Sequence, residues 1–152
     1  VRAIGVSNFT TDRLIDLIEF NNVVPAVNQI ETHLLCQRLA EHEWLEKYHV
    51  RHMAYAPLGQ GRKNEMFENP VLTKIANVYE KTPAQIALRF LMQSNVIIIP
   101  KSVHEERIKE NMNIFDFELN AEEMEQLRKM DMAAPMIGNP ENPTLVEAAM
   151  KW

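Results

Sequence analysis

Residues 25–55 read PAVNQIETHLLCQRLAEHEWLEKYHVRHMAY, and this stretch decides the fold class. The run at 25–30 has the length and apolar composition of a buried strand. A charged helical pattern follows at 37–49, and a second strand-like run at 50–55 ends on Tyr55. Two strands joined through a helix form a parallel unit, because a parallel neighbour is reached only through a crossover connection.

The same alternation of strand and helix continues on both sides of that stretch. Strand-like runs at 1–7 and 96–100 are rich in Val, Ile and Ala, as parallel strands covered on both faces are. Residues 14–18 form an apolar helical stripe, with Thr10 or Thr11 as its predicted cap. Four strand–helix units therefore follow one another, with no internal repeat and no linker between them.

Four helix-start signals follow one another after residue 68. Two combine a capping residue with a first-turn proline and two have capping-box spacing: Asn69-Pro70, Thr82-Pro83, Ser102-x-x-Glu105 and Asn120-x-x-Glu123. The first two predict helices over 71–79 and 84–93. We expect a single domain over 1–152, in which 131–152 is a carboxyl-terminal tail, mostly loop, with a short helix at 145–150.

Four parallel units in 152 residues fit two architectures. One is a small open, doubly wound sheet, and the other is half of an eight-stranded (β/α)8 barrel of the TIM type. A complete barrel of that type needs about 250 residues, so only half of one fits here. Both architectures produce the same hydrophobic periodicity, which leaves the choice open at this point.

The composition excludes several classes of protein. The net charge is −5 and no segment concentrates Lys and Arg, so we expect no nucleic-acid partner. No apolar run approaches the ~20 residues of a membrane span. The single cysteine, Cys36, provides no disulfide framework and favours the reducing cytoplasm. The sequence begins without Met inside a strand-like run, and we interpret it as truncated.

Polar side chains follow the predicted strands at their carboxyl ends, where parallel α/β folds bind ligands. Ser7 and Asn8 follow the first strand, Gln29 lies near the end of the second, and Tyr55 ends the third. Amide and hydroxyl groups suit a neutral, planar ligand that carries an amide. The ring of Tyr55 offers a face for stacking.

The end of the fourth strand has a different chemistry. Lys101 supplies a cation and Ser102 a hydroxyl, just before the amino end of a predicted helix. Arg107, Glu110 and Asn111 share one face of that helix, because they are three and four residues apart. A lysine, a serine, a helix amino terminus and a guanidinium describe a site for a phosphate monoester. The Gly-x-Gly-x-x-Gly turn of a Rossmann site is missing.

Most of these residues also have a purely structural interpretation. Ser102 would cap its helix, Arg107 would be a solvated helix residue, and Tyr55 would be part of the core. The neighbouring Lys101 and Asn111 favour binding for Arg107. We favour ligand binding for Gln29 and Tyr55, and a backbone-satisfying role for Asn28.

The histidines, the cysteine and the methionines are interpreted as structural residues. We expect His33 to be a loop or pocket-wall residue and Cys36 to be an unreactive thiol. The other histidines show no ligand spacing with carboxylates, so we predict no metal site; they are His42, His49, His52 and His104. The nine methionines are interpreted as core filler.

Four motifs resemble those of the aldo-keto reductase family, in the order in which that family carries them. They are Ala3-Ile4-Gly5-Val6-Ser7-Asn8-Phe9, Val27-Asn28-Gln29-Ile30-Glu31, Ala54-Tyr55-Ala56-Pro57-Leu58-Gly59, and Ile99-Pro100-Lys101-Ser102 followed by Arg107-x-x-Glu110-Asn111. The resemblance runs from Val1 to about Asp131. It implies strands five to eight of a (β/α)8 barrel, the carboxyl-terminal half, and so selects the half barrel over the open sheet.

The resemblance implies a role in binding NADP(H) for each matching position. Ser7, Asn8 and Gln29 would bind the nicotinamide carboxamide, and Tyr55 would stack on the nicotinamide ring. Leu58 and its loop would contact the pyrophosphate. Three residues would bind the 2′-phosphate and two would contact the adenine: Lys101, Ser102 and Arg107, and then Glu110 and Asn111. The family's catalytic Asp, Tyr, Lys and His lie on strands that the chain lacks, so we assign it no catalytic residue.

The implied function is the NADP(H)-dependent reduction of aldehydes and ketones to alcohols, for which this chain would supply the cofactor-binding half. We expect the isolated chain to be inactive and its open barrel edges to promote self-association. The alternative is a non-catalytic, self-associating dinucleotide-binding or regulatory module, and a third possibility is a remnant with no ligand. Two departures weaken any inference about the substrate: Leu34 stands where the family often has Pro, and Ala56 where Ser is common.

Overall fold

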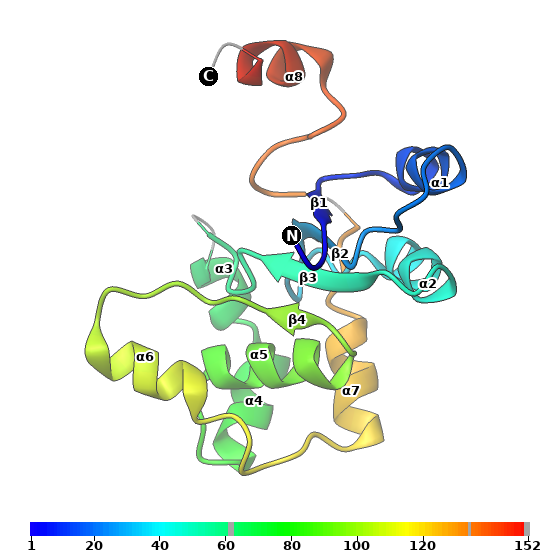
Figure 1. Cartoon of the computed structure of the whole chain (residues 1–152). Coiled ribbons are helices and arrows are strands. Elements are labelled where there is room, and N and C mark those ends of the chain that lie inside the picture. Colours follow the sequence, from blue (N-terminus) through cyan, green and yellow to red (C-terminus); the bar gives the residue numbers. More distant parts are fainter. Residues whose placement is uncertain (61–62, 134, 151–152) are drawn as a thin grey trace.

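The computed structural model of the chain describes residues 1–60, 63–133 and 135–150. Over these residues, helices and strands alternate as the sequence predicts, with additional helices late in the chain (Figure 1). In order, the elements are β1 (Gly5–Ser7), α1 (Thr11–Glu19), β2 (Val27–Glu31), α2 (Leu39–Lys47), β3 (Arg51–Tyr55), α3 (Lys63–Phe67), α4 (Pro70–Val78), α5 (Pro83–Gln93), β4 (Ile97–Ile98), α6 (Glu105–Met112), α7 (Ala121–Arg128) and α8 (Pro143–Ala149).

The strands form one parallel sheet in the order β1-β2-β3-β4. Ser7 pairs with Gln29, Gln29 with Met53, and Met53 with Ile97, so one residue from each strand lies in a continuous row. Two residues further toward the carboxyl ends, Glu31 pairs with Tyr55. The prediction of parallel βα units is confirmed, and residues far apart in sequence reach the same end of the sheet.

The two faces of the sheet differ in how well they are covered. Successive strand residues point to opposite faces. Ile30 and Ala54 are 5% and 0% exposed, because they face the helices. Gln29, Met53 and Tyr55 on the other face are only half-buried. Among the described residues, the helices therefore cover one face of the central strands, whereas on the other face Gln29, Met53 and Tyr55 stay partly accessible and Glu31 is buried.

Two clusters of buried apolar side chains hold the helices to the sheet. The main cluster includes Leu72, Phe90 and Leu127, from α4, α5 and α7 respectively. These three helices lie together on one side of β4 (Figure 1). A smaller cluster, centred on Leu14 and Leu45, packs α1 and α2 against β2. At about 25 cal/mol per Å² of apolar area buried, such clusters are the main favourable contribution to folding.

The two outermost strands are shorter than predicted. The predicted strand at 1–7 is observed only over Gly5–Ser7, and the one at 96–100 only over Ile97–Ile98. Each has a single hydrogen-bonded neighbour among the described residues, so the backbone N–H and C=O groups on its outer edge have no strand to pair with there. Extended backbone at these positions is therefore less strongly stabilised. The alternation of apolar residues fixed the position of both strands but not their length.

The other boundaries agree with prediction within about two residues. The predicted ranges 25–30, 37–49, 50–55, 71–79, 84–93 and 145–150 become Val27–Glu31, Leu39–Lys47, Arg51–Tyr55, Pro70–Val78, Pro83–Gln93 and Pro143–Ala149. The short α3 was not predicted. The methionine prediction is wrong in part, because Met112, Met132 and Met150 are exposed.

The predicted caps have mixed outcomes. The Asn69 side chain accepts a hydrogen bond from the Val71 N–H, and the capping boxes that begin at Thr82 and Asn120 are both present. The box predicted at Ser102 is wrong: α6 begins two residues later, with His104 at its N-cap and no side-chain cap. The Ser102 hydroxyl instead accepts a hydrogen bond from the His104 N–H at 3.1 Å, a local turn that competes with capping. Thr10 is the N-cap of α1, but its hydroxyl bonds Asp12 rather than a backbone N–H.

Candidate functional site

The predicted residues at the ends of β1, β2 and β3 come together. The Ser7 hydroxyl donates to the Gln29 carbonyl oxygen at 2.9 Å, and the Asn8 N–H donates to the same oxygen at 3.0 Å. The Asn8 side chain lies close enough to the Tyr55 hydroxyl to lower its pKa. Three adjacent strands therefore bring two amides, a hydroxyl and an aromatic ring to one edge of the sheet, which we call the strand-end cluster: Ser7, Asn8, Gln29 and Tyr55.

The Gln29 carboxamide retains most of its hydrogen-bonding capacity. Its amide nitrogen contacts the Met53 sulfur at 3.1 Å, and sulfur is a weak acceptor. The side chain is half-buried and faces the uncovered side of the sheet. Asn28 points the opposite way: it is 2% exposed and its amide donates to the Phe9 carbonyl oxygen at 2.8 Å. The sequence-based preference for Gln29 as ligand residue and Asn28 as structural residue agrees with this geometry.

Tyr55 lies at the border between core and solvent. Burial raises the pKa of its hydroxyl, the nearby Glu31 carboxylate adds to the rise, and the Asn8 side chain opposes it. The hydroxyl is therefore protonated at neutral pH, and the half-buried ring is held in place by its neighbours. A planar ligand that stacks on such a ring gains contact area at little cost in side-chain entropy.

A second group of predicted residues lies just before α6 and along it. Lys101 and Arg107 are exposed, and neither forms an ion pair with any residue in the described ranges. Ser102, Glu110 and Asn111 are half-buried. Because α6 has no side-chain cap, its first N–H groups are open to an anion. We call this group the α6 cluster: Lys101, Ser102, Arg107, Glu110 and Asn111.

Leu58 is only half-buried, but its side chain packs against the main core cluster. It can therefore meet a ligand only through its backbone or the exposed part of its side chain. Two of its neighbours, Ala56 and Gly59, have positive φ values of 50° and 63°, which set the path of the loop. The rest of the predicted loop, at 61–62, lies outside the described residues.

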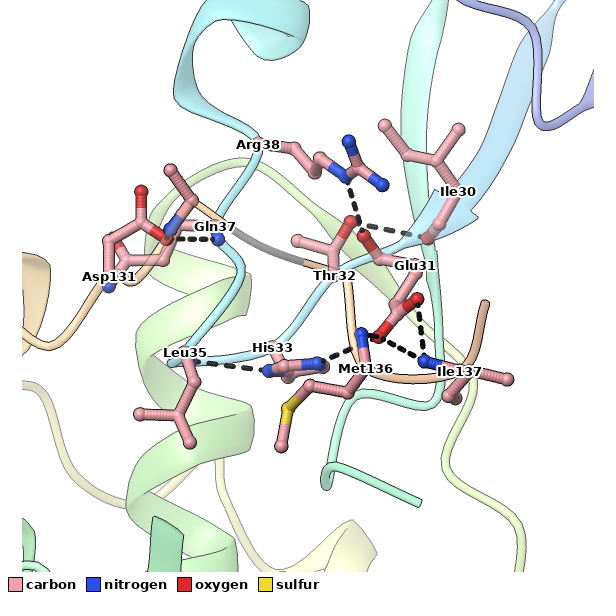
Figure 2. A network of polar contacts seen from close by, with 11 residues as sticks. Ile30, Glu31, Thr32, His33, Leu35, Gln37, Arg38, Asp131, Met136 and Ile137 are labelled. Carbon is pink, nitrogen blue, oxygen red and sulfur yellow. Dashed lines mark hydrogen bonds and ion pairs between the residues drawn. The ribbon is translucent and has the colours of Figure 1, made fainter. Parts of the chain in front are cut away.

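Figure 2 shows a buried polar cluster around Glu31 that the sequence did not assign. Glu31 is the register partner of Tyr55 on the neighbouring strand. Glu31 is 1% exposed, and its carboxylate accepts hydrogen bonds from the His33 ring at 3.1 Å and the Met136 N–H at 2.6 Å. His33 is 0% exposed, so it is a core residue rather than a pocket wall. The signal that could have found Glu31 is strand alternation, which places it on the same face as Gln29.

Two of the other histidines, His42 and His52, form a second polar cluster, toward the amino end of β3. The His52 ring contacts the Thr32 hydroxyl at 2.7 Å through Nε2 and the His42 ring at 3.0 Å through Nδ1. His42 also pairs with Glu46 at 3.4 Å, four residues along α2, a contact that the sequence analysis did not predict. Burial lowers the pKa of His52 to about 3. Among the described residues, no three His, Cys, Asp or Glu side chains are arranged to bind a metal ion.

Cys36 is buried, and burial raises its pKa to about 11. The thiol is therefore protonated at neutral pH and a poor nucleophile, as the sequence indicated. The helices over the described ranges are all too short or too polar to cross a lipid bilayer.

Comparison with protein-family models matches residues 1–132 to the aldo/keto reductase family. Among curated proteins, the chain is similar to methylglyoxal reductase DkgA of Yersinia pestis, with 41% identity over 141 residues, covering 93% of this chain and 50% of the relative. It is also similar to aldose reductase C of Dictyostelium discoideum, with 40% identity over 131 residues, covering 86% of this chain and 40% of the relative. The chain thus spans half or less of the length of these relatives.

Solved structures give the same result for the fold. The crystal structure of MGS-M4, an aldo-keto reductase enzyme from a Medee basin deep-sea metagenome library, matches with a TM-score of 0.91 and 37% identity, over 93% of this chain and 52% of that one. A Gox0644 mutant in complex with NADPH matches with a TM-score of 0.87 and 38% identity, over 93% of this chain and 52% of that one. The four parallel strands match a partial (β/α) barrel, and the half-barrel prediction is confirmed.

Proposed function

Because the chain belongs to the aldo/keto reductase family, we propose that it is the carboxyl-terminal half, strands five to eight, of an NADP(H)-dependent reductase of aldehydes and ketones. The observation that carries this proposal is the strand-end cluster, in which Ser7, Asn8, Gln29 and Tyr55 meet at one edge of the sheet. The order of the four motifs supports the assignment to the second half of the barrel. A single domain over 1–152, with 131–152 as its tail, is part of the proposal.

The residues at hand fit NADP(H) at both of its ends. The half-buried Gln29 side chain has an amide able to donate and accept hydrogen bonds, as a nicotinamide carboxamide requires, and Tyr55 offers a ring face beside it. At the other end, the α6 cluster supplies two cations without an ion-pair partner in the described part of the chain, and an uncapped helix terminus, for a 2′-phosphate. A relative with the same fold binds NADPH, which agrees with this fit.

In this proposal the chain binds and orients the cofactor. The nicotinamide, when bound, supplies a hydride to the carbonyl carbon of the substrate. Ser7, Asn8 and Gln29 fix the carboxamide, which sets the rotation of the ring, while Tyr55 covers one ring face and keeps water from it. The Leu58 loop would contact the pyrophosphate, and Glu110 and Asn111 the adenine. None of these residues protonates the substrate oxygen, so we assign no catalytic residue to this chain.

The experiment that tests the proposal is reconstitution of activity. We expect the 152-residue chain alone to reduce no methylglyoxal with NADPH. Joined to, or mixed with, the amino-terminal half of a relative, it should reduce methylglyoxal at a rate that saturates with NADPH. The matched control pairs the same half with a Gln29→Ala variant, which should raise the KM for NADPH. Activity of the chain alone, or reconstitution that does not depend on Gln29, would contradict the assignment.

A second candidate function is a self-associating, non-catalytic dinucleotide-binding module. The observation that favours it is that β1 and β4 each have an unpaired edge in the part of the chain described, where Ile4, Ile97 and Ile99 are exposed. A mass that rises with chain concentration, together with NADPH binding and failed reconstitution, would favour this alternative. In either case we propose a cytoplasmic protein, on the basis of its one buried thiol, with no nucleic-acid or membrane partner.

A further inference from the structure

The carboxyl-terminal segment is attached to the end of β2 by one carboxylate. Glu31 accepts hydrogen bonds from the Met136 N–H at 2.6 Å and the Ile137 N–H at 3.2 Å, although these residues lie 105 and 106 positions further along the chain (Figure 2). Its second oxygen lies 3.3 Å from the Ile137 N–H. Hydrogen bonds from backbone N–H groups to a buried carboxylate are among the stronger ones.

His33 holds this carboxylate in position. The Leu35 N–H donates to Nδ1 of His33 at 3.2 Å, so Nδ1 carries no proton and Nε2 carries the ring's proton. Nε2 then donates to Glu31 at 3.1 Å. Burial lowers the pKa of His33, which agrees with this neutral ring. Of the three donors around the Glu31 carboxylate, only the His33 ring lies outside the segment that Glu31 binds, and it orients the carboxylate toward that segment.

The same loop binds the chain again, on the other side of position 134. The Asp131 carboxylate accepts the Gln37 N–H at 2.9 Å, and the Met132 N–H donates to the Leu35 carbonyl oxygen at 2.9 Å. Residues 31–37, to which this loop binds, are all buried. The connection from α7 to residues 135–137 is thus attached at both ends, and Glu31 is the attachment nearer to α8.

Glu31 and Tyr55 are register partners on neighbouring strands and belong to the same face of the sheet. The Glu31 carboxylate also contributes to the raised pKa of Tyr55, which places the two groups in one electrostatic environment. Any shift of the 135–137 segment on Glu31 is therefore transmitted next to the Tyr55 ring. The α6 cluster is distant in the sheet, since it follows β4 rather than β2.

We propose that Glu31 is a positioning residue: it anchors residues 135–137 beside Tyr55 and thereby fixes the part of the site where the carbonyl substrate and the nicotinamide meet. The effect of Glu31 on catalysis rests on the proposed function, whereas its anchoring of residues 135–137 does not depend on that function. The segment is bound through its backbone N–H groups, so the anchor does not depend on which side chains follow in the tail.

The test compares Glu31→Ala and Glu31→Gln with Glu141→Gln, a control that removes the same charge from an exposed position in the tail. Hydrogen exchange of the Met136 and Ile137 amides in the full chain is the first measurement. We expect Glu31→Ala to accelerate it about tenfold or more, as expected for a lost local anchor. Glu31→Gln keeps one acceptor oxygen and should restore part of the protection. Unchanged exchange in Glu31→Ala would overturn the anchor.

The second measurement is nitration of tyrosine by tetranitromethane, mapped by mass spectrometry. Tyr55 should react about threefold faster in Glu31→Ala, while Tyr48, on the other side of the sheet, serves as the internal reference. In the reconstituted enzyme the same variant should raise the KM for methylglyoxal about tenfold and change the KM for NADPH less than about threefold. Faster exchange with unchanged Tyr55 reactivity and unchanged KM would overturn the positioning role. Failure of reconstitution with the unsubstituted chain would contradict the proposed function instead. Hydrogen exchange and nitration would then still test whether Glu31 anchors residues 135–137.

Discussion

Replacing Arg107 with alanine is expected to weaken the binding of NADPH about 10- to 100-fold and the binding of NADH less than about threefold. Arg107 is exposed and has no ion-pair partner among the described residues, so its guanidinium is available to an incoming anion. NADPH and NADH differ only in the 2′-phosphate. A guanidinium holds a phosphate through two charge-assisted hydrogen bonds, and these are lost only from the ligand that has the phosphate.

The matched control is Lys109→Ala on the same helix. Lys109 is also exposed, but it pairs with Glu105 at 2.7 Å and follows Arg107 by two positions, which places it on another face of α6. Its removal should change NADPH affinity less than about threefold, a loss typical of a charge that acts only through the surrounding field. Equal losses of NADPH and NADH affinity in Arg107→Ala would remove the phosphate assignment.

Stability is expected to fall as the pH drops below about 6.5, by about 2 kcal/mol at pH 5, because of His52. The folded chain keeps this ring neutral: it is 2% exposed, and burial lowers its pKa from 6.5 to about 3. In the unfolded chain the ring regains its ordinary pKa and takes up a proton. Between these two values the unfolded state binds more protons, so the contribution is complete above pH 6.5 and is lost progressively toward pH 3.

Urea unfolding between pH 7.5 and 5 measures this effect. His52→Gln should reduce the difference in stability between the two pH values by about 2 kcal/mol, while His104→Gln, at an exposed position, should leave it unchanged. His33 is neutral for the same reason, so a smaller dependence of the same sign should remain. The depressed pKa values of Asp12 and Asp116 act only below this range. A pH dependence that survives His52→Gln in full would contradict the assignment.

The fold was largely predictable because its central elements satisfy local and global requirements together. The run that becomes β2 buries Ile30 toward the helices, and the helix after Thr82 has a proline, a capping box and an apolar face in agreement. The edge strands were overestimated, since the residues around Ile97 are apolar enough for a long strand but have one hydrogen-bonded neighbour among the described residues. The length of a strand depends on its hydrogen bonding with neighbouring strands, and the local sequence does not predict that pairing.

The capping boxes show the same limit at the level of single residues. Asn120 and Ser102 are both followed by glutamate three positions later, yet only Asn120 caps a helix. The two hydroxyl or amide acceptors have alternative donors nearby, and Ser102 bonds the His104 N–H instead. Which donor Ser102 binds depends on the backbone conformation between the end of β4 and the start of α6, and the spacing of residues alone does not predict that conformation.

The candidate site was predictable where its residues follow strand ends and was missed where it depends on distant segments. Gln29 and Tyr55 could be placed together because parallel strands end at the same edge. Glu31 follows Gln29 by two residues in the same strand. Its partners Met136 and Ile137 bind it through backbone N–H groups, which every residue except proline has, so neither composition nor spacing predicts these contacts. Contacts of this kind require the folded chain.

The most direct test of the cofactor assignment is a titration of the purified chain with NADPH, followed by protein fluorescence, with NADH as the control ligand. The account predicts saturable binding that favours NADPH over NADH by about tenfold or more, because the α6 cluster meets the 2′-phosphate. Circular dichroism of the same sample establishes that the chain is folded. A folded chain that binds neither dinucleotide, or binds both equally, would contradict the claim that this half holds NADP(H).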